Sequence, residues 1–177
     1  MNNKIKNGLE WVKAATKEGF IYVKWDGSKL AKECPICHDH IKGGNHYGGN
    51  CIWFASAYLR HGMGINNVKC ACNGLLGGSS SYTMILVLPR RIAQAFINSK
   101  LGTGRFQLIR KKYRKILDEN DIKPGDIIIY YKVLFFWHVA VYIGEEKIID
   151  CASKSGGVTE RSWDLPYKCK VALRYIG

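Results

Sequence analysis

Long apolar runs are missing from this sequence, and their absence excludes a membrane-spanning helix. The longest run, residues 133–144, is interrupted by His138 and is too short for a span, which needs about 20 residues. Residues 1–6 are polar and basic, and no apolar segment follows them as in a secretory signal. Internal repeats and low-complexity tracts are missing as well. We therefore expect a chain made as a soluble cytoplasmic protein without a signal peptide.

Acidic residues are also scarce. Fourteen aspartates and glutamates stand against 27 lysines and arginines, which leaves a net charge of +13 at pH 7. A basic cluster at residues 105–115 is most simply interpreted as a solvated helix face. The overall charge favours a polyanionic partner, such as nucleic acid, anionic lipid or an acidic polymer. Because no helix-turn-helix, zinc-finger or base-stacking motif accompanies the charge, we expect no nucleic-acid partner.

Length and the pattern of apolar residues predict one α+β domain, residues 1–177. A chain of 177 residues can bury roughly two-thirds of the surface of its unfolded state. Helices early in the chain and strands later indicate N-terminal helices packed on an antiparallel β-sheet, a meander. The expected helices are residues 9–17, 51–60, 89–98 and 111–119, and residues 20–25 are expected to be extended. The expected strands are residues 126–131, 136–143, 147–151, 157–161 and 170–176.

Cys51 follows a glycine-rich turn, residues 47–50, and opens an apolar stretch of helical character. Far downstream, His138 lies in a strand-like run, and Asp150 ends the next one. A thiol at a helix N-terminus, a strand histidine and a polar orienting group are the parts of a cysteine nucleophile. The helix end stabilises the thiolate, the histidine takes and returns a proton, and the carboxylate orients the imidazole. The alternative for the cysteine and the histidine is a structural place in the core.

The histidine belongs to a pattern of three segments: GDIIIY at residues 125–130, HVAVYIG at residues 138–144 and IID at residues 148–150. This pattern resembles the signature of the NlpC-type cell-wall cysteine peptidases, whose papain-like core is shared with the CHAP-type amidases. In that family the nucleophilic cysteine opens a helix before the signature, and the third catalytic residue lies on the strand after that of the histidine. The resemblance therefore implies a papain-like core with three catalytic residues: Cys51, His138 and Asp150.

Two positions depart from the family pattern. The family usually has Asp before the cysteine and Ser after it, where this sequence has Asn50 and Ile52. This departure leaves the substrate subsites unassigned. The third catalytic residue is more often His, Asn or Gln than the Asp150 found here. Because a carboxylate accepts the same hydrogen bond from the imidazole, the mechanism is unchanged.

The turn between the two strands decides whether His138 and Asp150 can meet. A three-residue loop at residues 144–146 would make them diagonal neighbours on one face of the sheet. A two-residue loop at residues 145–146 would place them on opposite faces. The catalytic interpretation therefore predicts the longer loop.

The resemblance implies a monomeric hydrolase that cuts amide bonds in peptidoglycan peptides, as an endopeptidase or an amidase, without a catalytic cofactor. The small size and the missing signal suggest a phage lysin or tail-associated enzyme that reaches the cell wall after phage-mediated release. Tyr47 or Trp53 is expected to line the substrate cleft, with core packing as the alternative for Trp53. Two other functions stay open: a non-catalytic basic module that binds an anionic cell-wall polymer, and an acyltransferase on the same core.

Four further cysteines form two pairs, a C-x-x-C at Cys34 and Cys37 and a C-x-C at Cys70 and Cys72. Because C-x-x-C is a common half of a tetrahedral zinc site, these four thiols predict a structural zinc. The alternatives are disulfides, which an intracellular chain disfavours, and unpaired buried thiols. One thiolate could be replaced by a neighbouring histidine: His38, His40 or His46.

The other cysteine hypotheses are less specific. A redox role for Cys37 would need a strand before the pair and a helix after it, and residues 38–44 make a poor helix. Cys151 and Cys169 have no partner in the sequence pattern and are expected in the core.

Overall fold

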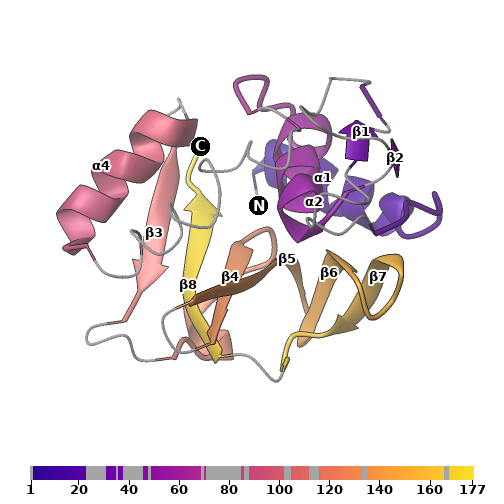
Figure 1. Ribbon diagram of the computed structural model, residues 1–177. Helices are drawn as coiled ribbons and strands as arrows, with labels where there is room; N and C mark the ends of the chain where they lie inside the picture. Colours follow the sequence, from indigo (N-terminus) through magenta and orange to yellow (C-terminus); the bar gives the residue numbers. More distant parts are fainter. Residues whose placement is uncertain are drawn as a thin grey trace.

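The computed structural model describes residues 2–22, 31–34, 36–37, 46–47, 49–68, 70, 85, 88–101, 105–111, 116–132, 135–165 and 168–177. Within this part of the chain the helical elements are α1 (Asn3–Ala15), α2 (Cys51–Ala57), the π-helical turn η1 (Tyr58–Gly62), α4 (Arg90–Leu101) and the 3-10 turn η3 (Glu119–Asp121). The strands are β1 (Ala31–Glu33), β2 (His46–Tyr47), β3 (Phe106–Arg110), β4 (Ile127–Lys132), β5 (Phe135–Gly144), β6 (Lys147–Ala152), β7 (Gly157–Ser162) and β8 (Lys168–Tyr175). Figure 1 shows α1 and α2 gathered at one side of the molecule and α4 beside β3.

Six strands form one antiparallel sheet in the order β3-β8-β4-β5-β6-β7. β4, β5, β6 and β7 are sequential neighbours, as the expected meander requires, and β8 then returns to lie between β3 and β4. This arrangement confirms the α+β fold class. The five predicted strands are all present, each within one or two residues of its expected ends.

The helix predicted for residues 111–119 is not found at residue 111 or at residues 116–119, while residues 112–115 lie outside the described residues. The strand before it, β3, was not predicted. β3 pairs with β8, and Phe106 and Leu108 point into the core with an exposed residue between them. Residues 116–118 have no regular structure, and η3 follows them, capped by Asp118. Pairing with β8 therefore makes residues 106–110 a strand, although the sequence pattern did not indicate one.

The other helices lie close to their expected places. α1 begins earlier than expected because the Asn2 side chain caps it. The helix expected at residues 51–60 is confirmed, since α2 continues directly into η1, and the helix expected at residues 89–98 is confirmed as α4. α1 packs closely on η1, so that a Cβ at Gly62 would lie 3.1 Å from the Cα of Gly8. The helix that carries Cys51 is therefore supported along its C-terminal end by α1.

The main core lies between the sheet and the helices. Apolar side chains from one face of β4, β5, β6 and β8 pack with those of α1, α2 and α4. A second cluster on the opposite face includes Leu117, Ile122 and Leu165. Because α2 contacts both β5 and β6, the elements that carry Cys51, the histidine and the aspartate are packed against one another.

In the described part of the chain, none of the helices has the length and apolar character that crossing a membrane would require.

Candidate active site

Cys51 occupies the first position of α2, and its neighbours explain why the helix begins there. Asn50 has an extended backbone, and its Oδ1 accepts hydrogen bonds from the backbone N–H groups of Ile52 and Trp53 at 2.9 and 3.0 Å. Such a cap satisfies N–H groups that have no partner inside the helix. The Cys51 thiol, 9% exposed, therefore lies at the positive end of the helix dipole, where a thiolate is favoured.

The turn before Cys51 is held from two sides. The N–H of Gly49 donates to the carbonyl oxygen of Ile21 at 3.2 Å, and the Gly49 carbonyl accepts a hydrogen bond from Cys151 Sγ on β6 at 3.2 Å. A Cβ at Gly49 would lie 2.4 Å from the Trp53 ring, so this position requires glycine. Cys151 is buried in the core, as expected. The backbone that positions Cys51 is thus tied to the strand that carries Asp150.

His138 and Asp150 meet in the structure. The distance from His138 Nε2 to Asp150 Oδ2 is 2.5 Å. His138 is 8% exposed and Asp150 is completely buried, so the contact is shielded from water. The carboxylate therefore holds the imidazole ring in one orientation, which is the role expected for the third residue of a catalytic triad.

The hairpin that brings them together differs from the expected one. The turn between β5 and β6 has two residues, Glu145 and Glu146, both with positive φ, and Gly144 pairs with Lys147. The register then shifts by one residue, because Val141 pairs with Ile149 and Tyr142 with Ile148. The expected loop length is thus wrong, but the register that a three-residue loop predicts is confirmed, because Val141 pairs with Ile149 and Tyr142 with Ile148. The expectation that a two-residue turn separates the side chains is also wrong. A β-bulge at Ile143 restores the shared face.

Cys51 lies within hydrogen-bonding reach of the His138 ring. Since Nε2 faces Asp150, the ring nitrogen available to the thiol is Nδ1. Burial disfavours the charged ring, but the charge of a Cys51 thiolate and the contacts with Asp150 outweigh it and raise the pKa of His138 to about 9. At neutral pH His138 is therefore an imidazolium beside the Cys51 sulfur, and an imidazolium is the partner that a cysteine nucleophile requires.

Arg161 on β7 completes the site and was not identified from the sequence. Its Nε donates to Asp150 Oδ2 at 2.9 Å, its Nη2 contacts the same oxygen, and Nη2 lies 3.2 Å from His138 Nε2. Asp150 pairs with Thr159 across the β6–β7 ladder, so Arg161 is its diagonal neighbour on the same face. The guanidinium compensates the charge of a carboxylate that water does not reach. The sequence could have indicated Arg161, because side chains two residues apart in the strand predicted at residues 157–161 point to the same face of the sheet.

The two aromatic residues expected at the substrate cleft have different outcomes. Trp53 is completely buried, and its ring packs edge-on against Phe20 with centroids 5.5 Å apart. It therefore cannot line a cleft, and its prediction as a substrate-binding residue is wrong. The alternative, core packing, is correct because a side chain of this size on the inner face of α2 fills the space under the Gly49 turn. The side chain of Tyr47 lies outside the described residues.

Three of the four cysteines predicted to bind zinc come together. Cys34, Cys37 and Cys70 are neighbours, and the fourth member of their cluster is His61 from η1. The predicted fourth ligand, Cys72, lies outside the described residues, as do His38, His40 and the side chains of His46 and Cys169. The sequence pattern did not point to His61, because it directly follows the helix expected at residues 51–60, which was interpreted through Cys51 alone.

Comparisons with known proteins bear on the family. The model of the NlpC/P60 family matches residues 55–176. Among solved structures, NlpC1 from Trichomonas vaginalis is 16% identical, with 96% of this chain and 44% of that chain covered and a TM-score of 0.45. The P60 domain of an antigen from Mycobacterium avium subspecies paratuberculosis is 14% identical, with 98% of both chains covered and a TM-score of 0.46. The peptidoglycan hydrolase RipB from Mycobacterium tuberculosis is 16% identical, with 100% and 69% covered and a TM-score of 0.48.

The chain spans a little under half of the length of the two Trichomonas vaginalis structures it matches. No curated protein matches the chain. The family match begins after Cys51 and contains His138, Asp150 and Arg161. Since it covers more than half of the sequence, the chain belongs to the NlpC/P60 family.

Proposed function

We propose that this protein is a cysteine hydrolase that cleaves amide bonds in the peptides of bacterial peptidoglycan, with Cys51 as nucleophile. The observation that carries the proposal is the buried His138–Asp150 pair beside a cysteine at a helix N-terminus, with the pKa of His138 raised to about 9. Membership of the NlpC/P60 family supports the choice of substrate class.

The proposed reaction has two steps. The Cys51 thiolate attacks the amide carbonyl carbon and forms a C–S bond, while the imidazolium of His138 gives its proton to the leaving amine as the C–N bond breaks. A water molecule then attacks the thioester, and its proton goes to His138 as the C–O bond forms and the C–S bond breaks. The Asn50 cap uses the N–H groups of Ile52 and Trp53, which leaves the backbone N–H of Cys51 to stabilise the oxyanion.

The type of bond cleaved is the test of this proposal. Purified peptidoglycan is digested with the protein, and new amino termini and new reducing ends are counted while the fragments are identified by mass spectrometry. We expect new amino termini without new reducing ends, and none after the protein is alkylated with iodoacetamide. New reducing ends would identify cleavage of the glycan and would contradict the proposal. Products joined to an added amine would instead indicate acyl transfer.

Added salt should weaken binding to the cell wall without changing the rate of peptide hydrolysis. Because the net charge is +13, association with an anionic wall should weaken steadily as salt is added, whereas hydrolysis of a small uncharged peptide substrate should change little. The measurements are co-sedimentation with purified walls and peptide turnover over one salt series. If wall binding does not change with salt concentration, the net positive charge does not drive association with the wall. Binding without any turnover would favour the non-catalytic basic module.

Replacing Arg161 should shift the pH profile in a specific direction. Arg161→Met removes a positive charge 3.2 Å from His138 Nε2, so the imidazolium becomes easier to form and the alkaline limb of kcat/KM should move to higher pH. Loss of the guanidinium from the buried Asp150 carboxylate, which keeps its contact with His138, should lower the free energy of unfolding by roughly 1–3 kcal/mol. Arg161→Lys keeps the charge and serves as the control, with its alkaline limb near that of the wild type. A limb that moves to lower pH in Arg161→Met would contradict this role.

A further inference from the structure

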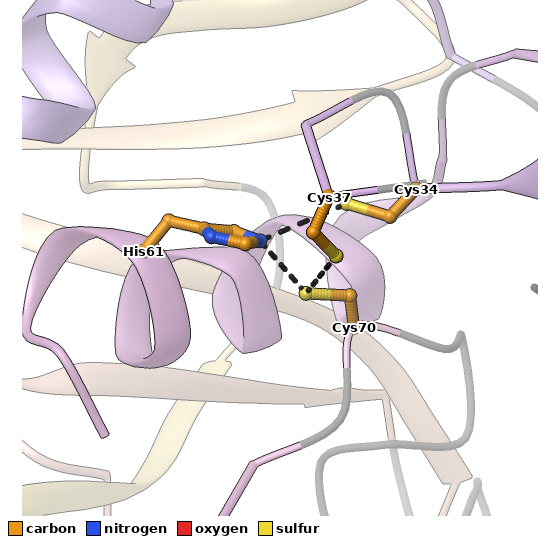
Figure 2. A group of neighbouring side chains, drawn as sticks. All are labelled: Cys34, Cys37, His61 and Cys70. Carbon is orange, nitrogen blue, oxygen red and sulfur yellow. Dashed lines mark hydrogen bonds between the residues drawn. The ribbon is translucent and has the colours of Figure 1, made fainter. Parts of the chain in front are cut away.

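A compact group of metal-binding side chains lies next to the nucleophile helix. Cys34, Cys37, His61 and Cys70 each direct one donor atom toward a common centre, and all four atoms lie within 4.8 Å of one another (Figure 2). We call these residues the Cys34 cluster. In the described part of the chain no other group of three or more histidine, cysteine or carboxylate side chains has this geometry.

The spacing of the donor atoms matches a tetrahedral zinc site. Zinc binds thiolates at about 2.3 Å and imidazole nitrogen at about 2.0 Å, which separates tetrahedral ligands by about 3.8 Å for two sulfurs and about 3.5 Å for sulfur and nitrogen. The Sγ atoms of Cys37 and Cys70 are 3.8 Å apart, and His61 Nε2 lies 3.8 Å from Cys34 Sγ and 3.0 Å from Cys70 Sγ. A disulfide needs sulfurs about 2.05 Å apart, and none of the described cysteines forms one.

Three N–H groups surround the sulfur of Cys34. The indole Nε1 of Trp53 donates to it at 3.4 Å, and the backbone N–H groups of Ile36 and Cys37 also bond to it. Donors of this kind orient a metal-binding thiolate and compensate its charge.

The cluster joins three separate segments of the chain. Cys34 and Cys37 precede the nucleophile, Cys70 follows it, and His61 lies in η1, which directly continues α2. Trp53, two positions after Cys51, makes a second link from α2 to Cys34. A metal at this place would therefore hold the nucleophile helix at its C-terminal end and along its inner face, while the Asn50 cap and β6 hold its N-terminal end.

We infer that Cys34, Cys37, His61 and Cys70 form a structural Cys₃His zinc site that anchors the helix carrying Cys51. All four positions are filled by protein side chains, so the site has no open position for water and is not catalytic. The donor set of three thiolates and one imidazole selects zinc over magnesium or calcium, which prefer oxygen ligands. The inference concerns metal content and folding, and it does not depend on the reaction at Cys51.

Metal content is the first test. The full chain is purified without added metal and washed with dilute EDTA. Its zinc content is then measured by inductively coupled plasma mass spectrometry. We expect about one zinc per chain. His61→Ala and Cys70→Ser should carry less than about a tenth of that, whereas His61→Cys, which offers a fourth thiolate, should retain zinc. Cys72→Ser is the matched control, because it removes a neighbouring thiol outside the proposed ligand set, and it should retain zinc.

The ligand set is tested further by cobalt. Wild-type protein refolded with Co²⁺ should show thiolate-to-cobalt charge transfer and the visible bands of tetrahedral cobalt, and this result does not depend on the folding of any variant. Loss of zinc in Cys72→Ser with retention in His61→Ala would overturn the Cys₃His assignment. Wild-type protein that holds neither zinc nor cobalt, or that has fewer than its seven free thiols when denatured under non-reducing conditions, would overturn the site altogether.

The anchoring role has its own readout. Removal of zinc with a strong chelator should lower the melting temperature and change the rate at which iodoacetamide alkylates Cys51, because the helix end is released. The control is Cys51→Ala, which should hold zinc and show the same loss of melting temperature on chelation. Zinc that is removed without any change in melting temperature or alkylation rate would contradict a structural role.

Discussion

Cys51→Ala is expected to lower kcat/KM for a soluble peptidoglycan peptide by at least about a thousandfold. Without the sulfur no thioester forms, and the histidine and oxyanion donors alone give only residual catalysis. Cys51→Ser should be nearly as inactive, because a hydroxyl does not form the ion pair with His138 that ionises a thiol. The measurement is release of new amino termini under single-turnover and steady-state conditions, beside a thermal melt that verifies folding.

A second measurement of Cys51 does not depend on knowing the substrate. Iodoacetamide should alkylate Cys51 faster than the other thiols near neutral pH, because the helix N-terminus and His138 favour its thiolate. Cys169→Ser is a suitable control for loss of a thiol, since its strand β8 is separated from β5 by β4, and it should keep wild-type turnover. Cys51 that resists alkylation in the native protein, together with an active Cys51→Ala variant, would exclude it as the nucleophile.

Replacing Asp150 should reduce activity in a definite order and move the alkaline limb of the pH profile. Asp150→Asn keeps an acceptor for His138 but removes the charge, and we expect a loss of roughly tenfold. Asp150→Ala also frees the ring to rotate and leaves the Arg161 cation beside the imidazolium, so a loss of about a hundredfold or more is expected. In both variants the imidazolium is less favoured, and the alkaline limb should move to lower pH.

The direction follows from the pKa of His138. Burial alone would lower it, but a Cys51 thiolate and Asp150 raise it to about 9, above its ordinary value of about 6.5. The imidazolium that protonates the leaving amine is therefore present up to about pH 9, and turnover should fall above that pH. Because the folded-state pKa is raised, the ion pair stabilises the fold fully below about pH 6.5, and this contribution is lost as pH rises through about 9.

The test is kcat/KM against pH for the wild type and both Asp150 variants, with folding verified at each pH. Arg161→Met supplies an internal comparison, because its alkaline limb should move the opposite way. If Asp150→Ala keeps the wild-type rate and pH profile, Asp150 does not orient His138, and the family analogy fails at this position.

The sequence alone determined the parts of the molecule whose signals are local. The glycine-rich turn before an apolar stretch located α2 and Cys51, since a cap and a helical pattern lie within about ten residues. Short apolar runs bounded by turn residues located β5 and β6 with His138 and Asp150, because a strand that is covered on both faces has a nearly continuous apolar sequence. The C-x-x-C pair likewise indicated Cys34 and Cys37 as candidate metal ligands.

Tertiary structure alone decided what depends on residues far apart in the chain. Pairing with β8 made β3 a strand, and the bulge at Ile143 put His138 and Asp150 on one face although their turn has two residues. Packing of separate segments brought Arg161 to Asp150 and His61 to the cysteines. The physical reason is that register, diagonal contacts and cluster membership depend on which distant strands and helices lie side by side, and no local period or spacing encodes that.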